Sequence, residues 1–106
     1  VFGAMHGRTL WRIRAADLAN AKLNDEQLAQ RLEKFGEKPV SDGITIDRVG
    51  NVYTTDVNNN AISVTTPDGR SRVLVRDDAR LRWADGLSFG PDGTLYATVN
   101  QLHRFA

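Results

Sequence analysis

The 106-residue sequence contains no cysteine, which excludes disulfide bonds, thiolate metal ligands and a cysteine nucleophile. It also lacks a surplus of charge of one sign, because 14 Lys and Arg stand against 13 Asp and Glu. The basic residues are scattered beside acidic ones, as in residues 75–80, so the one-sided basic patch that binds nucleic acid is not expected. No apolar run approaches the ~18 residues of a membrane-spanning helix, and we expect no membrane partner. Because the chain begins with Val1 rather than methionine, we expect its natural start, and any targeting segment, to lie upstream.

A repeat of 43 residues organises the second half of the chain. The pair Asp42-Gly43, followed by apolar residues in alternation, returns as Asp85-Gly86. Further positions recur in the same register, namely Gly50 with Gly93, Val52 with Leu95, Tyr53 with Tyr96, Thr55 with Thr98, and Ile62 with Phe105. A period of this length is typical of one four-stranded blade of a β-propeller.

The alternation of apolar residues predicts the strands of these units. Residues 42–76 make one complete blade, with strands at 44–46, 52–56, 61–65 and 72–75 joined by glycine-containing turns. The second copy ends after its third strand. At the N-terminus, residues 10–13 resemble a third strand and residues 1–2 the end of a second.

One segment between these units has the pattern of a helix. Asn24 is expected to be its N-cap, with Gln27 completing a capping box. One apolar face follows at helical spacing, formed by Leu28, Leu32 and Phe35. Gly36 is predicted to end the helix, and Pro39 prevents its continuation. We expect this helix to be an insertion that covers strands at the outer edge of a blade, with partner binding as the alternative.

The sequence therefore predicts an all-β fold, a partial β-propeller of about two and a half four-stranded blades with one inserted α-helix. Residues 1–41 form the end of one blade with the helical insertion, 42–83 the complete blade, and 84–106 the incomplete blade. Open blade edges carry unpaired backbone groups. We therefore expect either missing blades or copies of this chain that pair edge to edge as a homo-oligomer.

Asp42 and Asp85 are the main candidate site residues. Each precedes a glycine at the entrance to the innermost strand of its blade, and such entrances surround the central channel of a propeller. Carboxylates gathered there can bind a cation such as Ca²⁺, act as a general base or hold a polar ligand. The alternative is structural, because Asp-Gly is a turn sequence whose carboxylate caps local N–H groups. Asn100, directly after the strand at 95–99, is a further candidate for an amide facing the channel.

Other chemistry-bearing residues have simpler explanations. Residues 56–60 begin like a calcium loop but lack its glycine and distal glutamate, so a turn is expected. His6 and His103 have no third metal ligand with them. Gly-x-Ser-x-Gly does not occur, and serine hydrolase chemistry has no support. Trp11 and Trp83 are suited to stacking a ring-shaped ligand or to packing sheets together.

Several of these segments together resemble the bacterial branch of the major royal jelly/yellow protein family. They are Lys-Pro-Val-Ser-Asp-Gly-Ile-Thr-Ile-Asp at 38–47, Gly-Asn-Val-Tyr at 50–53, Trp-Ala-Asp-Gly-Leu-Ser-Phe at 83–89 and Asn-Gln-Leu-His-Arg-Phe at 100–105. Leu-Trp-Arg-Ile-Arg at 10–14, followed by a helix, also fits that layout, so the resemblance covers nearly the whole chain. More distantly, the Asp-Gly repeats resemble the gluconolactonase/senescence-marker group, which shares the six-bladed fold.

The resemblance implies a six-bladed propeller with a ligand site at its central channel, and a secreted or periplasmic location. Royal jelly and yellow proteins bind small organic ligands such as amines or sterols. Lactonase relatives instead hold Ca²⁺ or Zn²⁺ with Glu, Asn and Asp ligands, and their Asp lies at an Asp-Gly entrance. On this resemblance Asp42 and Asp85 match possible metal ligands, and Asp42, Asp85 and Asn100 match ligand-binding positions.

The length of the chain affects what the resemblance implies about function. At ~43 residues per blade, a whole family member needs about two to four times these residues. The expected function is thus that of a propeller fragment which binds a small organic ligand. The alternatives are a divalent-metal-dependent lactone hydrolase and an inactive remnant.

Overall fold

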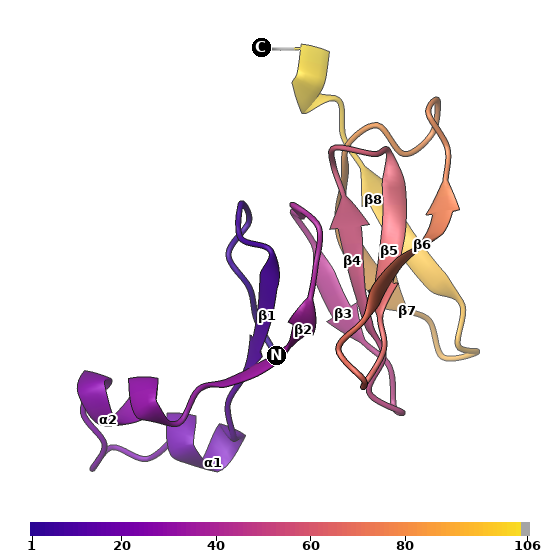
Figure 1. The fold of residues 1–106 in the computed structure, drawn as a ribbon. Coiled ribbons are helices and arrows are strands. Elements are labelled where there is room, and N and C mark those ends of the chain that lie inside the picture. The colour runs from indigo at the N-terminus through magenta and orange to yellow at the C-terminus, as the bar shows by residue number, and fades with distance from the viewer. Residues whose placement is uncertain (105–106) are drawn as a thin grey trace.

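The computed structural model describes residues 1–104, with the side chain of His103 excepted, and shows a mostly β fold (Figure 1). The elements in chain order are β1 (Thr9–Arg12), α1 (Ala15–Leu18), α2 (Asp25–Gln30), β2 (Glu33–Glu37), β3 (Ile44–Ile46), β4 (Val52–Asp56), β5 (Ala61–Thr65), β6 (Ser71–Arg76), β7 (Ala84–Phe89), β8 (Leu95–Val99) and the 3₁₀ turn η1 (Leu102–Arg104). Within the described residues the strands form three antiparallel sheets, β1-β2, β3-β4-β5-β6 and β7-β8. This arrangement confirms the expected all-β class and is compatible with a partial propeller.

The four-stranded sheet is the complete blade that the repeat predicts. Each strand pairs with its neighbour in sequence, so the order is β3-β4-β5-β6. Strand β5 is buried along its whole length, and with β4 it supplies most of the core, namely Val52, Ala61, Ile62 and Val64. Two of the hairpin turns contain glycines with positive φ, 92° at Gly50 and 87° at Gly69, as the turn sequences require. Local sequence pattern therefore accounts for this sheet.

The two smaller sheets, β1-β2 and β7-β8, lie in the two segments that were predicted to be incomplete blades. At the N-terminal end, Phe2 exchanges backbone hydrogen bonds with Trp11 of β1, at 2.9 and 2.8 Å, and so occupies the place of the expected second strand. At the C-terminal end, β7 and β8 are present, and the expected third strand, equivalent to β5, would begin at residue 104, so it lies almost entirely outside the described residues. Before that point the Leu102 N–H donates to the side chain of Asn100 at 2.8 Å and η1 follows, so these backbone groups are used in a turn. The repeat partner Phe105 lies outside the described residues.

The helical segment differs from its prediction. Asn24 does cap α2, and the capping box with Gln27 is complete. The helix, however, ends at Gln30, and the residues that were expected to continue it form β2, paired with β1. Two physical reasons favour the strand. Pairing with β1 satisfies the backbone groups of this segment, and Gly36 packs directly against the backbone of Gly69, where a helix has no room.

The predicted covering role of the helix is also wrong. Neither α1 nor α2 contains a buried residue. Both helices lie between β1 and β2 in the chain and extend away from the four-stranded sheet (Figure 1). Helix α2 is held instead to its own segment, where Arg31 pairs with Asp17 of α1 at 2.9 Å. The short helices therefore leave the strand edges uncovered.

Hydrogen bonds and an aromatic contact join neighbouring sheets. Between the first and second sheets, the Glu37 N–H donates to the Gly69 carbonyl at 3.0 Å, and the Thr65 hydroxyl donates to the Glu37 carbonyl at 2.5 Å. Between the second and third, the rings of Tyr53 and Phe89 meet edge to face with centroids 5.3 Å apart. The sheets thus pack in succession as the blades of a propeller do.

Lys38, in the link between β2 and β3, is buried and fixes the N-terminal turn. Its ammonium group donates to the carbonyls of Gly7 at 2.7 Å and Pro39 at 2.8 Å. Burial, and then the positive charge of Arg8, lower the pKa of Lys38. This lysine therefore has a structural role that its sequence context did not indicate.

The sheets leave exposed both apolar side chains, on β3, and, within the described residues, an unpaired strand edge, on β8. Ile44 and Ile46, predicted to share one face of a strand, are both exposed, and β8 pairs only with β7 among the described strands. The expectation that further blades or copies of this chain cover such surfaces stays a prediction. In residues 1–104 there is also no helix with the length and apolar character needed to cross a membrane.

Candidate functional site

The two Asp-Gly pairs lie directly against each other at the same end of neighbouring sheets. A Cβ atom placed on Gly43 would lie 2.3 Å from the carbonyl oxygen of Asp85 and 3.1 Å from the Cα of Gly86. Asp42 and Gly43 lead into β3, while Asp85 and Gly86 lie in the first half of β7. The structure therefore brings together the two strand entrances that the repeat singles out.

The Asp42 entrance is held by a buried threonine and by a tryptophan of the next unit. The backbone N–H groups of Asp42 and Gly43 both donate to the hydroxyl oxygen of Thr55, each at 2.9 Å. The indole N–H of Trp83 donates to Oδ2 of Asp42 at 3.0 Å. Among residues 1–104 no further hydrogen bond reaches the Asp42 carboxylate, and its side chain is exposed. One carboxylate oxygen is therefore accessible to a ligand.

The Asp85 entrance has different partners. Oδ1 accepts from the Thr98 hydroxyl at 2.6 Å, and Oδ2 accepts from the Asn100 amide at 2.7 Å. These hydrogen bonds, with that of Thr98 the stronger influence, lower the pKa of Asp85 because they favour the ionised carboxylate. The Asn100 backbone N–H donates in turn to the Trp83 carbonyl at 3.0 Å. Asn100 thus orients Asp85, and the predicted residues Asp85 and Asn100 form one group.

The two threonines at equivalent repeat positions have different hydrogen-bond partners, which the repeat did not predict. Thr55 and Thr98 occupy equivalent positions, yet Thr55 accepts from backbone amides and Thr98 donates to a carboxylate. Both threonines are repeat positions in the sequence, but neither was predicted to belong to the site. Trp83 was predicted to stack a ring-shaped ligand or to pack sheets together, and its hydrogen bond to Asp42 was not predicted. The recurrence of the threonine with each Asp-Gly pair was the available signal.

The donor set for a metal ion is incomplete in this part of the chain. Among the described residues, no group of three or more His, Asp or Glu side chains could hold a metal ion. Asp42 and Asp85 supply fewer oxygen atoms than the 6–8 that Ca²⁺ takes, and three of their four oxygens accept hydrogen bonds. The two aspartates thus do not by themselves fit a Ca²⁺ or Zn²⁺ site. His6 is exposed, and the side chain of His103 lies outside what the structure describes.

The asparagine-rich loop at 56–60 forms a turn, as expected. Buried Asp56 accepts from the backbone N–H of Asn59 at 3.2 Å and from its amide at 2.9 Å. Asn60 takes a positive φ of 52°, which asparagine tolerates. This carboxylate is therefore used in holding the loop.

A hollow of about 880 Å³ lies at the end of the sheets opposite to the Asp-Gly pairs. The turn after β3 and the turn after β7 line it, together with Tyr53 and Phe89. Its carboxylate Asp47 accepts from the Asn51 amide at 2.9 Å and the Tyr53 hydroxyl at 3.0 Å. These bonds hold the hairpin, so we place the candidate site at the Asp-Gly end, where one oxygen of Asp42 is without a hydrogen bond among the described residues.

Replacing Asn100 with alanine is expected to raise the pKa of Asp85 toward its ordinary value, because the ionised carboxylate loses a donor. In the native protein the lowered pKa adds stability above the pKa of the unfolded chain, which is lost as the pH falls through the folded-state pKa. NMR titration of the carboxyl carbons measures the pKa of Asp85, and urea denaturation at several pH values measures the change in stability. Asp92 is the internal control, since its pKa is lowered by Thr94 alone among its neighbours. An unchanged Asp85 titration would contradict the assigned hydrogen bond.

Comparison of this chain with known proteins gives no assignment. No protein-family model matches the sequence, and no curated protein matches it.

Proposed function

We propose that this chain is a segment of a royal-jelly/yellow-like β-propeller that binds a small organic ligand where its Asp-Gly entrances meet. The observation that carries the proposal is the direct contact between the Gly43 and Asp85 backbones. This contact places side chains from two sheets at one position, as ligand sites in propellers require.

The chemistry of the two entrances indicates the kind of ligand. Asp42 offers a charged acceptor that is exposed, and Trp83 beside it offers an aromatic ring that is partly exposed. A carboxylate paired with a ring suits a ligand with a donor group, such as an amine or a hydroxyl, on an apolar framework. Asp85, which is held by Thr98 and Asn100, adds negative charge near the same position.

The indole N–H of Trp83 provides a direct test, because it reports on the Asp42 carboxylate. In NMR titrations with small aromatic amines and alcohols, we expect the Trp83 indole signal to shift and saturate. The indole signal of Trp11, which lies on β1, should stay unchanged and serves as the control within the same molecule. Asp42→Asn should weaken binding of an amine by about tenfold, since a charge-assisted hydrogen bond is lost.

Titration with CaCl₂ or ZnCl₂ in the same experiment separates the alternatives. A saturable Trp83 response to the metal, with a raised melting temperature and none to the organic compounds, would favour the metal-dependent lactonase reading and contradict the proposal. A response of Tyr53 and Phe89 alone would move the ligand to the opposite end of the sheets. If neither class of compound binds, the chain is an inactive remnant.

A further inference from the structure

A small hollow of about 210 Å³ lies at the end of β8 and is lined by three arginines, Arg80, Arg82 and Arg104. Asn100 and Gln101 also line it, and none of its lining residues is Asp or Glu. Its volume is below the ~300–1,000 Å³ of sites for drug-sized molecules. It is therefore suited to one small group rather than to a whole organic ligand.

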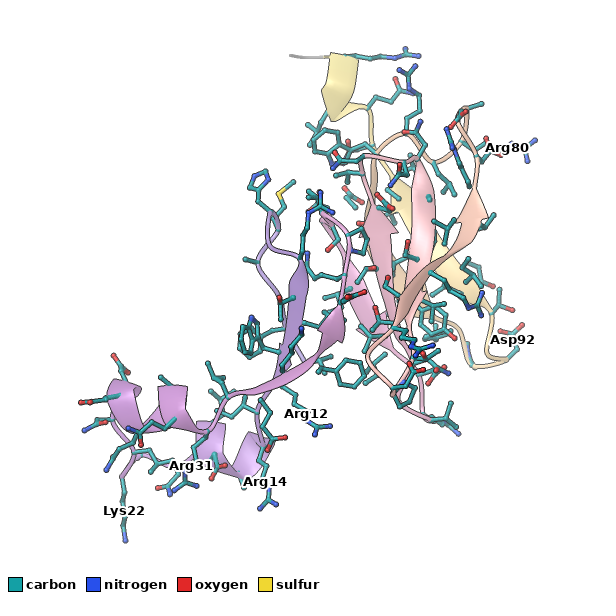
Figure 2. All side chains as sticks on the ribbon, in the orientation of Figure 1. Arg12, Arg14, Lys22, Arg31, Arg80 and Asp92 are labelled. Carbon is teal, nitrogen blue, oxygen red and sulfur yellow. The ribbon has the colours of Figure 1, made fainter. Side chains whose placement is uncertain are left out.

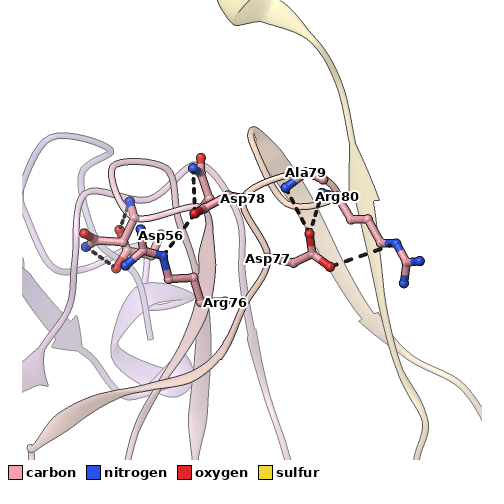
Figure 3. Close-up of polar contacts among 8 residues, drawn as sticks. Asp56, Arg76, Asp77, Asp78, Ala79 and Arg80 are labelled. Carbon is pink, nitrogen blue, oxygen red and sulfur yellow. Dashed lines mark hydrogen bonds and ion pairs between the residues drawn. The ribbon is translucent and has the colours of Figure 1, made fainter.

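The two carboxylates nearest to Arg80 in sequence, Asp77 and Asp78, already accept hydrogen bonds (Figure 3). Asp78 accepts from Arg76 at 3.0 Å and from Asn60 at 3.2 Å. Asp77 accepts from the backbone N–H groups of Ala79 and Arg80, at 3.0 and 2.9 Å, and its closest approach to the Arg80 guanidinium is 4.0 Å. The N···O distance between Arg80 and Asp77 is therefore at the upper limit for an ion pair, and their interaction is weak.

The other two arginines make no ion pair within residues 1–104. The hydrogen bond from Arg76 chiefly lowers the pKa of Asp78, and the charge of Arg82 adds to this effect, so Arg82 is partly compensated. Asp85, the carboxylate linked to this hollow through Asn100, already accepts from Thr98 and Asn100. The Asn100 side-chain oxygen accepts from the Leu102 N–H at 2.8 Å, which turns the chain so that Arg104 comes to line the hollow. The hollow thus combines an excess of positive charge, only partly compensated by Asp77 and Asp78, with a rim that is fixed by the Asn100 turn.

We propose that this arginine hollow binds a small anionic group, a phosphate or a carboxylate. Guanidinium groups donate paired N–H bonds in the planar geometry that both anions accept. Because the arginines are exposed, solvent and salt screen their charge, so binding is weak and falls as the ionic strength rises. This site goes beyond the proposed function, since Asp42 and Trp83 do not take part in it.

The test is a titration of the whole chain with sodium phosphate, and separately with sodium succinate, at constant ionic strength. The side-chain Nε–H signals of arginine and the amide signals of Asn100 and Gln101 are followed by NMR. We expect saturable shifts of Arg82 and Arg104 with at least one of the two anions. The double variant Arg82→Gln/Arg104→Gln should bind that anion about tenfold more weakly.

The matched control is Arg14→Gln/Lys22→Gln, which removes the same charge from the helical segment, on the far side of the molecule from β7 and β8 (Figure 2). This control should bind the anion as the native chain does. A response to phosphate alone identifies a phosphate site, and a response to both anions identifies a site that also takes carboxylates. Equal shifts at every arginine, no saturation, or unchanged affinity in the double variant would overturn the proposal. The Trp83 indole signal reads the proposed function separately, so either idea can fail without the other.

Discussion

Replacing Gly43 with alanine is expected to lower the free energy of unfolding by about 3 kcal/mol, a large share of the stability of a domain this size. The added Cβ atom would lie 2.3 Å from the Asp85 carbonyl oxygen, a backbone atom of β7. A flexible side chain could rotate away from such a contact, but a paired strand cannot move without disturbing its hydrogen bonds to β8. The substitution therefore forces apart the two sheets that form the candidate site.

Urea denaturation followed by circular dichroism measures this loss. Gly7→Ala is the matched control, because the nearest atoms to a Cβ there lie at 3.4 Å, an ordinary contact. The control should change stability by less than about 0.5 kcal/mol. The Trp83 indole signal should also shift in Gly43→Ala, since its bond to Asp42 crosses the same contact. Equal stabilities for the two variants would show that the second and third sheets do not pack as described.

Replacing Thr55 with valine is expected to cost about 3 kcal/mol, although valine has nearly the same shape. Thr55 is fully buried, and its hydroxyl oxygen accepts from two backbone N–H groups, those of Asp42 and Gly43. A buried donor left without an acceptor costs about 1–3 kcal/mol. Removal of the hydroxyl leaves the buried N–H of Gly43 and the partly buried N–H of Asp42 without an acceptor at the entrance to β3.

The neighbouring residue supplies an unusually close control. Thr54 is also fully buried, but its hydroxyl has no hydrogen-bond partner among the described residues. The buried Thr54 hydroxyl loses its hydrogen bonds to water on folding and gains none in return. Thr54→Val removes this cost, so the free energy of unfolding should rise by about 1 kcal/mol. Denaturation curves of the two variants should therefore move in opposite directions. If both variants lose stability to the same degree, the contrast assigned to these two hydroxyls is wrong.

Much of the fold could be predicted because it depends on local pattern. The 43-residue repeat, the alternation of apolar residues and the positive-φ glycines in the turns define the four strands of the complete blade. The capping box of Asn24 and Gln27 was predictable for the same reason, since both partners lie within one turn of helix. The Asp-Gly pairs were likewise visible as repeated strand entrances.

The end of the helix was not predictable in this way. The apolar spacing of residues 28–35 fits a helix, but β1 lies about twenty residues earlier in the chain and offers its edge to the same segment. The close approach of Gly36 to Gly69 adds a requirement that no local pattern contains. Tertiary pairing therefore overrode a local preference that is worth only tenths of a kcal/mol per residue.

The candidate site divides in the same way between sequence and structure. The sequence by itself determined that Asp42 and Asp85 stand at equivalent strand entrances, because equivalence is a property of the repeat. Only the tertiary structure decided which partner each carboxylate has, Trp83 for Asp42, and Thr98 with Asn100 for Asp85. The physical reason is that hydrogen bonds depend on distances of about 3 Å between side chains, and those distances are set by how one sheet packs against the next.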